Sequence, residues 1–182
     1  MRKFLNINFV LFILAFLSCS QSEPKVKQEI TTATPSVSSD TAVQPKATAQ
    51  IPEPIFVSEG ELSFLDATGN EKTKLEIEIV DNNADRQKGL MFRKKMAEHR
   101  AMLFVFEKQE PQAFWMKNTL MSLDIIFVND KNTVVSIQKN AQPLSEKSLP
   151  SEKPAIYVVE TNAGYTTKFG IKEGDKMSFK KY

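Results

Sequence analysis

Cysteine and histidine are almost absent from this 182-residue chain, which has one of each, Cys19 and His99. A single cysteine can form no internal disulfide, and these two residues cannot supply the Cys and His ligand set of a zinc site. Residues 55–182 contain no cysteine nucleophile and leave little room for a Ser-His-acid triad. His99 lies in a charged stretch and is predicted to be a surface residue. We therefore expect neither a metal nor a cofactor.

Motifs for nucleotides and an excess of basic charge are also missing. The chain has no glycine-rich phosphate loop followed by Lys-Ser or Lys-Thr, no dinucleotide fingerprint and no calcium-loop spacing. Its formal charge of +2 is due to Arg2 and Lys3, because removal of residues 1–18 leaves 22 basic and 22 acidic residues. General nucleic-acid binders carry a strong basic excess. We therefore expect no nucleic-acid partner.

No hydrophobic run is long enough for a membrane-spanning helix. The apolar run Phe9 to Leu17 is about half of the roughly 18 residues that such a helix needs. It follows Arg2 and Lys3 and ends in small or polar residues, which is the layout of a secretory signal peptide. We therefore predict that residues 1–18 are a signal peptide and that the protein is exported.

The only cysteine directly follows this run. The stretch Phe16-Leu17-Ser18-Cys19 resembles the lipobox of bacterial lipoproteins, although Phe16 stands where Leu is commonest. The resemblance implies that Cys19 becomes the acylated first residue, and acyl chains would hold the protein to a membrane of the cell envelope. The protein would then lie on the periplasmic face or at the cell surface. The alternative is an ordinary signal peptide with an incidental cysteine, which would release the domain.

Residues 19–54 and 55–182 differ in composition. The first segment is rich in Ser, Thr, Ala, Gln, Pro and Lys and has no aromatic residue, so it is predicted to be a disordered tether. As a flexible coil it would have an end-to-end distance of about 30 to 35 Å. Residues 55–182 carry the signals of a single globular domain.

Short apolar segments alternate with polar turns throughout this domain. Leu75, Ile77 and Ile79 alternate with Glu76 and Glu78, which predicts a strand with one apolar face. Residues 141–154 contain prolines and are predicted to be a loop. Strands are predicted at 62–65, 74–80, 101–106, 113–116, 123–128, 133–138, 155–161 and 176–180, and short helices at 84–90 and 163–169. This pattern predicts a mainly β fold, a compact antiparallel sheet curled into a barrel-like form with two short helices.

A series of segments within residues 72–180 resembles one known family. The segments are Arg86–Arg93, Met102–Phe106, Phe114–Thr119, Leu123–Phe127, Val135–Ile137, Pro143–Ser145, Tyr157–Glu160, Asn162–Gly164 and Gly170–Asp175. They resemble the domain-of-unknown-function family numbered 192, also called uncharacterised protein family 0127. The resemblance implies a small β-rich domain that is often exported or anchored, and it implies no mechanism.

Polar and aromatic residues crowd together between two predicted strands. Trp115, Lys117, Asn118 and Asp124 offer an aromatic platform with ammonium, amide and carboxylate groups, which suits a sugar or other polar ring. Arg93 is predicted to lie nearby. The alternative is purely structural: Trp115 fills the core, Lys117 pairs with Asp124, and Asn118 bonds the backbone at a turn.

Glu160 ends a strand that is apolar on both faces, so it is expected to be partly buried, paired by default with Arg93 or Lys117. If Asp124 and Glu160 faced one cleft, they would provide the acid and base of a glycan hydrolase. Our leading hypothesis is instead a non-enzymatic ligand-binding or accessory module. A purely structural or protein-interaction lipoprotein, with an envelope protein as partner, is the third candidate.

Overall fold

A single curled sheet holds the strands of residues 53–182, the part of the chain that the computed structural model describes. These residues belong to one unit, Thr48–Tyr182. The elements are β1 (Gly60–Leu65), β2 (Glu71–Val80), α1 (Asn83–Lys88), β3 (Arg100–Phe114), β4 (Leu123–Val128), β5 (Val134–Ala141), β6 (Leu149–Asn162), α2 (Tyr165–Lys168) and β7 (Lys176–Lys181). The predicted signal peptide, Cys19 and nearly all of the predicted tether lie outside the described residues.

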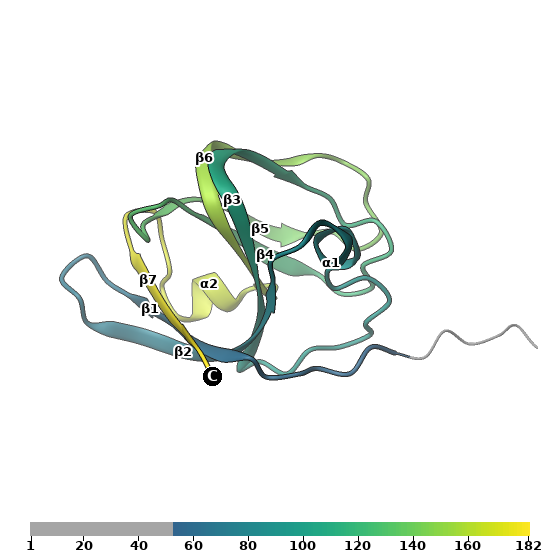
Figure 1. The fold of residues 1–182 in the computed structure, drawn as a ribbon, viewed down its shortest axis with the longest axis horizontal. Helices are drawn as coiled ribbons and strands as arrows, with labels where there is room; N and C mark the ends of the chain where they lie inside the picture. Colours follow the sequence, from purple (N-terminus) through teal and green to yellow (C-terminus); the bar gives the residue numbers. More distant parts are fainter. Residues whose placement is uncertain (1–52) are drawn as a thin grey trace, which may run out of the picture. The chain divides into compact units, whose positions relative to one another are not determined.

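The sheet curls until its two edge strands approach each other. The strand order is β5-β4-β6-β3-β2-β1-β7, and neighbours are antiparallel except for the parallel pair β2 and β3. At one end Thr133 bridges to Lys176, and the Met177 amide donates to the Asn132 carbonyl at 2.8 Å. The prediction of a mainly β, barrel-like sheet with two short helices is confirmed (Figure 1).

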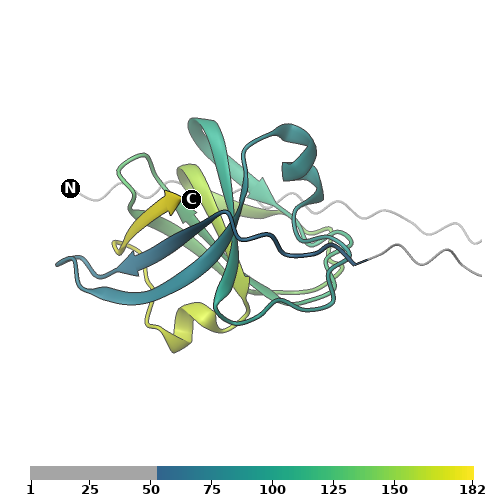
Figure 2. The same cartoon turned by 60° about the horizontal axis from the view of Figure 1, so that its bottom comes forward.

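Each face of the sheet packs against its own core. The inner core includes Leu62, Phe64, Ile77, Leu103, Ile126, Val159 and Tyr165. The outer core includes Leu90, Met102, Phe104, Met116, Ile125, Phe127 and Val158. Tyr165 at the start of α2 adds to the inner core, whereas Leu90, just after α1, adds to the outer one. Figures 1 and 2 accordingly show α1 on the outside of the curl.

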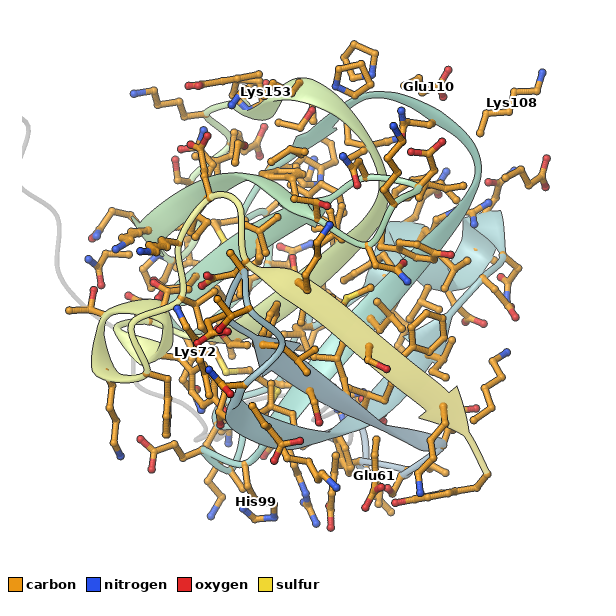
Figure 3. The ribbon with its side chains drawn as sticks, turned by 90° about the vertical axis from the view of Figure 1, so that its left-hand side faces the viewer. Glu61, Lys72, His99, Lys108, Glu110 and Lys153 are labelled. Carbon is orange, nitrogen blue, oxygen red and sulfur yellow. The ribbon has the colours of Figure 1, made fainter. Side chains whose placement is uncertain are left out.

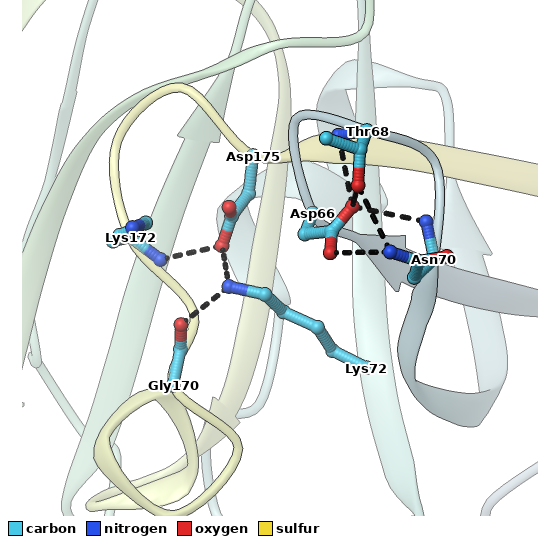
Figure 4. Close-up of polar contacts among 7 residues, drawn as sticks. All are labelled: Asp66, Thr68, Asn70, Lys72, Gly170, Lys172 and Asp175. Carbon is cyan, nitrogen blue, oxygen red and sulfur yellow. Dashed lines mark hydrogen bonds and ion pairs between the residues drawn. The ribbon is translucent and has the colours of Figure 1, made fainter.

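A partly buried ion pair joins β2 to the turn before β7. The Lys72 ammonium lies 2.6 Å from the Asp175 carboxylate and donates to the Gly170 carbonyl, while the Lys172 amide donates to the same carboxylate oxygen (Figure 4). In the β1–β2 turn, hydrogen bonds from Thr68 and then Asn70 hold the pKa of Asp66 well below its ordinary value. These contacts fix the closed end of the curl.

Two strands are longer than the sequence predicts. The predicted strands 101–106 and 113–116 are largely one strand, β3, and part of the predicted loop 141–154 belongs to β6. β3 pairs with β6 on both sides of a register shift between Val105 and Glu110. Residues 107–111 of β3 are exposed and polar or Pro, so the apolar sequence pattern stops there while the strand continues. Figure 3 shows Lys108, Glu110 and Lys153 on this projecting, solvated part of the pair.

Candidate functional site

A cavity of about 420 Å³ lies between α1 and the outer face of β3 and β6, and we call it the α1 pocket. Residues that line its buried inner end are Leu90, Phe104, Thr119 and Glu160, and exposed residues at its outer end are Asn83, Gln87, Lys88 and Trp115. Its volume falls within the range of small-molecule sites. The pocket therefore combines an apolar interior with a polar rim.

α1 is positioned by its caps and by one arginine. Asn82 caps the helix by accepting the Asp85 amide hydrogen at 3.0 Å. Arg86 donates to the Val105 carbonyl of β3 at 2.6 Å, and its guanidinium lies 5.2 Å from the centroid of the Phe106 ring. Gly89 has φ 44°, and a Cβ there would lie 3.2 Å from the Phe104 ring. Because of these contacts, the helix lies close against β3 at one side of the pocket.

Phenylalanine rings form the apolar part of the lining. Phe104 and Phe114 meet edge to face with centroids 5.0 Å apart, and Phe106 and Phe114 do so at 6.3 Å. Edge-to-face pairs stabilise a fixed arrangement of the rings. The lining is therefore preformed.

Glu160 is the buried acidic group of the pocket. Its exposed fraction is 5%, and its cross-strand neighbours, Met102 and Ile125, are apolar. Burial raises the pKa of Glu160 to about 8, and no hydrogen bond or ion pair with a described residue opposes that shift. The predicted pairing with Arg93 or Lys117 is wrong. Burial therefore favours the neutral carboxyl, which is able to donate a hydrogen bond.

Trp115 and Lys117 lie together at the rim. The Lys117 ammonium is 5.2 Å from the centroid of the Trp115 ring and 3.7 Å from the Glu146 carboxylate. Trp115 is 49% exposed, so the alternative in which it fills the core is wrong, as is the pairing of Lys117 with Asp124. Trp115 also borders a second hollow of about 310 Å³, which Glu146 helps to line.

Asn118 occupies the turn after Trp115. Its backbone is left-handed, with φ 55°, and its carbonyl accepts the Phe92 amide hydrogen at 2.8 Å. Its side-chain amide lies 3.8 Å from the sulfur of Met91, which lines the α1 pocket. Asn118 therefore holds the turn and supports the pocket from behind.

Asp124 is not part of the pocket. It is fully buried and accepts three hydrogen bonds, from the Asn140 amide at 2.9 Å, the Thr166 amide at 3.0 Å and the Thr166 hydroxyl at 2.6 Å. Asp124 pairs across the sheet with Thr161, whereas Glu160 pairs with the next residue of β4, Ile125. Because successive residues of a strand point to opposite faces, the two carboxyls cannot share a cleft. The predicted hydrolase pair is wrong.

Arg93 also lies apart from the α1 pocket. It is 7% exposed, and its guanidinium is 2.6 Å from the carboxylate of Glu78, which the sequence pattern had placed opposite the apolar face of β2. Glu78 is covered by chain on two sides, because Arg93 pairs with it and Val57, ahead of β1, donates its amide hydrogen to it at 2.9 Å. Arg93 borders a separate hollow with Phe56 and Arg100.

Sequence reasoning missed Gln87, Lys88 and the phenylalanines as lining residues. They are brought together only by the packing of α1 against β3, which no local pattern reveals.

Within residues 53–182, no group of three or more His, Cys, Asp or Glu side chains is placed to hold a metal ion. No helix in this part of the chain is long and apolar enough to cross a membrane.

Comparison with known proteins places this domain in a family. Residues 65–179 match the DUF192 family, described as "Uncharacterized ACR". The chain belongs to the DUF192 family. No significant match was found among curated proteins.

Two solved structures have the same fold. One is a protein of Sinorhizobium meliloti 1021 described as a candidate transcription regulator, with 35% identity, a TM-score of 0.64 and coverage of 68% of this chain and 97% of the other. The second is a protein of unknown function from Novosphingobium aromaticivorans DSM 12444, with 35% identity, a TM-score of 0.62 and coverage of 65% and 83%. The match covers almost the whole of the Sinorhizobium chain and about two thirds of this one.

Proposed function

We propose that this protein is a lipid-anchored, non-enzymatic binding module of the bacterial cell envelope, which takes a small polar ligand into the α1 pocket. The observation that carries the proposal is the carboxyl of Glu160, a largely buried residue that lines an aromatic-walled cavity and has no hydrogen-bond or ion-pair partner within residues 53–182. Buried polar groups are normally hydrogen-bonded, and an unpartnered one destabilises the fold. A ligand that hydrogen-bonds Glu160 would offset this cost.

The rim indicates the shape of the ligand. Trp115 offers a half-exposed ring face, and Asn83, Gln87 and Lys88 offer amide and ammonium groups beside it. A sugar or similar polar ring has the matching combination of an apolar face and hydroxyl groups around its edge. A neutral Glu160 would donate to an oxygen of such a ring and accept from a hydroxyl.

The anchor is supported by the sequence alone. Phe16-Leu17-Ser18-Cys19 resembles a lipobox, and the composition of residues 19–54 suits a tether between a lipid and the domain. Anchoring would keep the pocket near envelope glycans and lipids. These are the ligands to test first.

The proposal is tested by a thermal-shift screen of residues 53–182 against cell-wall sugars, lipopolysaccharide fragments, phosphates, nucleotides and lipids. A ligand at about 100 times its Kd adds roughly 2.7 kcal/mol to the free energy of unfolding, a shift of several degrees. We expect a sugar to raise the Tm of the wild type and not that of Trp115→Ala. His99→Ala is the matched control, because His99 is exposed outside the pocket. A screen without any shift, or a shift retained in Trp115→Ala, contradicts the proposal.

A further inference from the structure

Three loops meet at one end of the domain and carry exposed apolar side chains. The Phe92 amide donates to the Asn118 carbonyl at 2.8 Å, and the Leu144 amide donates to the Thr119 carbonyl at 3.1 Å. We call the surface formed by Phe92, Leu120 and Leu144 the apolar tip; their exposed fractions are 38%, 43% and 61%. Hydrophobic residues gathered on one exposed surface indicate contact with a partner or a membrane.

The backbone of the tip is strained at two of these residues. Phe92 has φ 64° and Leu144 has φ 58°, in the left-handed region that bulky residues rarely adopt. Neither side chain is buried in return, so both the conformation and the exposure destabilise the domain. Strain that persists at exposed residues is typical of functional surfaces. The tip therefore has the features of a surface that acts outside the domain.

The described chain begins at the same end. The Glu53 carboxylate accepts the amide hydrogen of Lys94, two residues from Phe92, at 2.9 Å. Figures 1 and 2 both show the first described residues beside these loops. A tether that runs from Cys19 to Glu53 would therefore join the domain close to the apolar tip.

Basic side chains accompany the tip. Lys94 and Lys95 follow Phe92, Lys117 precedes Leu120, and Lys147 follows Leu144. Lys94, Lys95 and Lys147 are exposed, and Lys117 is partly exposed beside Glu146. Each exposed apolar residue thus has at least one lysine within three residues along the chain, and the carboxylates of Glu53 and Glu146 lie at the same end. Exposed apolar side chains with nearby lysines suit the interface of an anionic membrane, where the lysines meet headgroups.

We propose that the apolar tip docks on the surface of the membrane to which the chain is anchored, with Phe92, Leu120 and Leu144 inserted among the lipids. This inference adopts the lipid anchor of the proposed function. Docking would present the rim of the α1 pocket, at Trp115, close to the membrane.

The test uses residues 53–182 without the anchor, mixed with vesicles of phosphatidylcholine alone or with one quarter phosphatidylglycerol. Trp115, the single tryptophan of the chain, is half exposed and reports on its surroundings. We expect co-sedimentation with the anionic vesicles, weaker binding at high salt, and a blue shift of the Trp115 emission. Absence of binding to both vesicle types overturns the proposal and leaves a protein as the partner of the tip.

Glycine variants separate docking from folding. Phe92→Gly and Leu144→Gly remove the apolar side chain and relieve the left-handed backbone, so their Tm is expected to equal or exceed that of the wild type. Together they are expected to lower vesicle binding by about tenfold or more. If Phe92→Gly lowers the Tm, Leu144→Gly alone is used to test docking. Leu144 is the more exposed of the two, so its loss removes fewer contacts within the domain.

Asn132→Gly is the matched control, because Asn132 is exposed, has φ 55° and lies in the β4–β5 turn, outside the tip. Wild-type binding by the tip variants overturns the docking proposal. Such a result does not affect the proposed lipid anchor or the proposed pocket. The anchor is tested separately with Cys19→Ser, and the pocket with the thermal-shift screen of Trp115→Ala.

Discussion

At the scale of single residues, three carboxyls of similar sequence context have different environments. Asp124 is satisfied by three donors, Glu78 is paired with Arg93, and Glu160 has no partner among the described residues. The sequence shows only that each lies in or beside an apolar strand. Which carboxyl has a partner depends on the segments that cover the sheet, so it could not be predicted locally.

Asp124→Ala is predicted to destabilise the domain by roughly 3 kcal/mol or more, because it leaves the buried amide and hydroxyl of Thr166 without an acceptor. Urea denaturation of residues 53–182 measures this cost. Asp130→Ala, at an exposed position, is the control and should change stability by less than about 0.5 kcal/mol. A cost near that of the control would show that Asp124 does not fasten β4 to α2.

Glu160 also makes stability depend on pH. Its folded pKa of about 8 lies above the ordinary value of 4.5, so the folded state binds more protons between these values. Stability from this group is therefore greatest below about pH 4.5 and is lost as the pH rises through 8. A ligand that bonds to the neutral carboxyl would be released as the pH rises through about 8, where the folded protein loses this proton.

At the scale of elements, the strands were predicted better where their apolar pattern is regular. The prediction at 123–128 matches β4, whose six residues are all buried. β3 was divided because Glu107 to Glu110 are exposed, and the strand continues there because β3 pairs with β6 on both sides of this stretch, through Val105 and again through Glu110. A long-range partner of this kind leaves no mark on the local sequence.

The short helices show the same limit. The helix predicted at 84–90 lies within two residues of α1 at each end, since its ends are set by local properties, the Asn82 side-chain cap and the positive φ of Gly89. α1 buries none of its own residues, so its sequence does not indicate the face that it covers. The α1 pocket therefore could not be predicted, although Trp115 and Glu160 were both identified as candidates.

At the scale of the whole molecule, the proposed function requires a membrane anchor beside a domain with a ligand pocket. Cys19→Ser is predicted to move the protein from the membrane fraction to the soluble fraction after a high-salt wash, because acyl chains on Cys19 would provide the durable attachment. Cell fractionation and mass spectrometry of the mature N-terminus measure this outcome. Ser22→Ala, in the tether segment, is the control. A Cys19→Ser protein that stays in salt-washed membranes contradicts the anchor.

The most direct test of the central claim is an NMR titration of the Glu160 side-chain carboxyl carbon in residues 53–182, assigned by comparison with Glu160→Gln. We expect a pKa near 8, because burial disfavours the charged carboxyl and no residue of 53–182 pairs with it. A pKa near the ordinary 4.5 would mean that the group is solvated or paired. That result would contradict the proposal that Glu160 hydrogen-bonds a ligand in the α1 pocket.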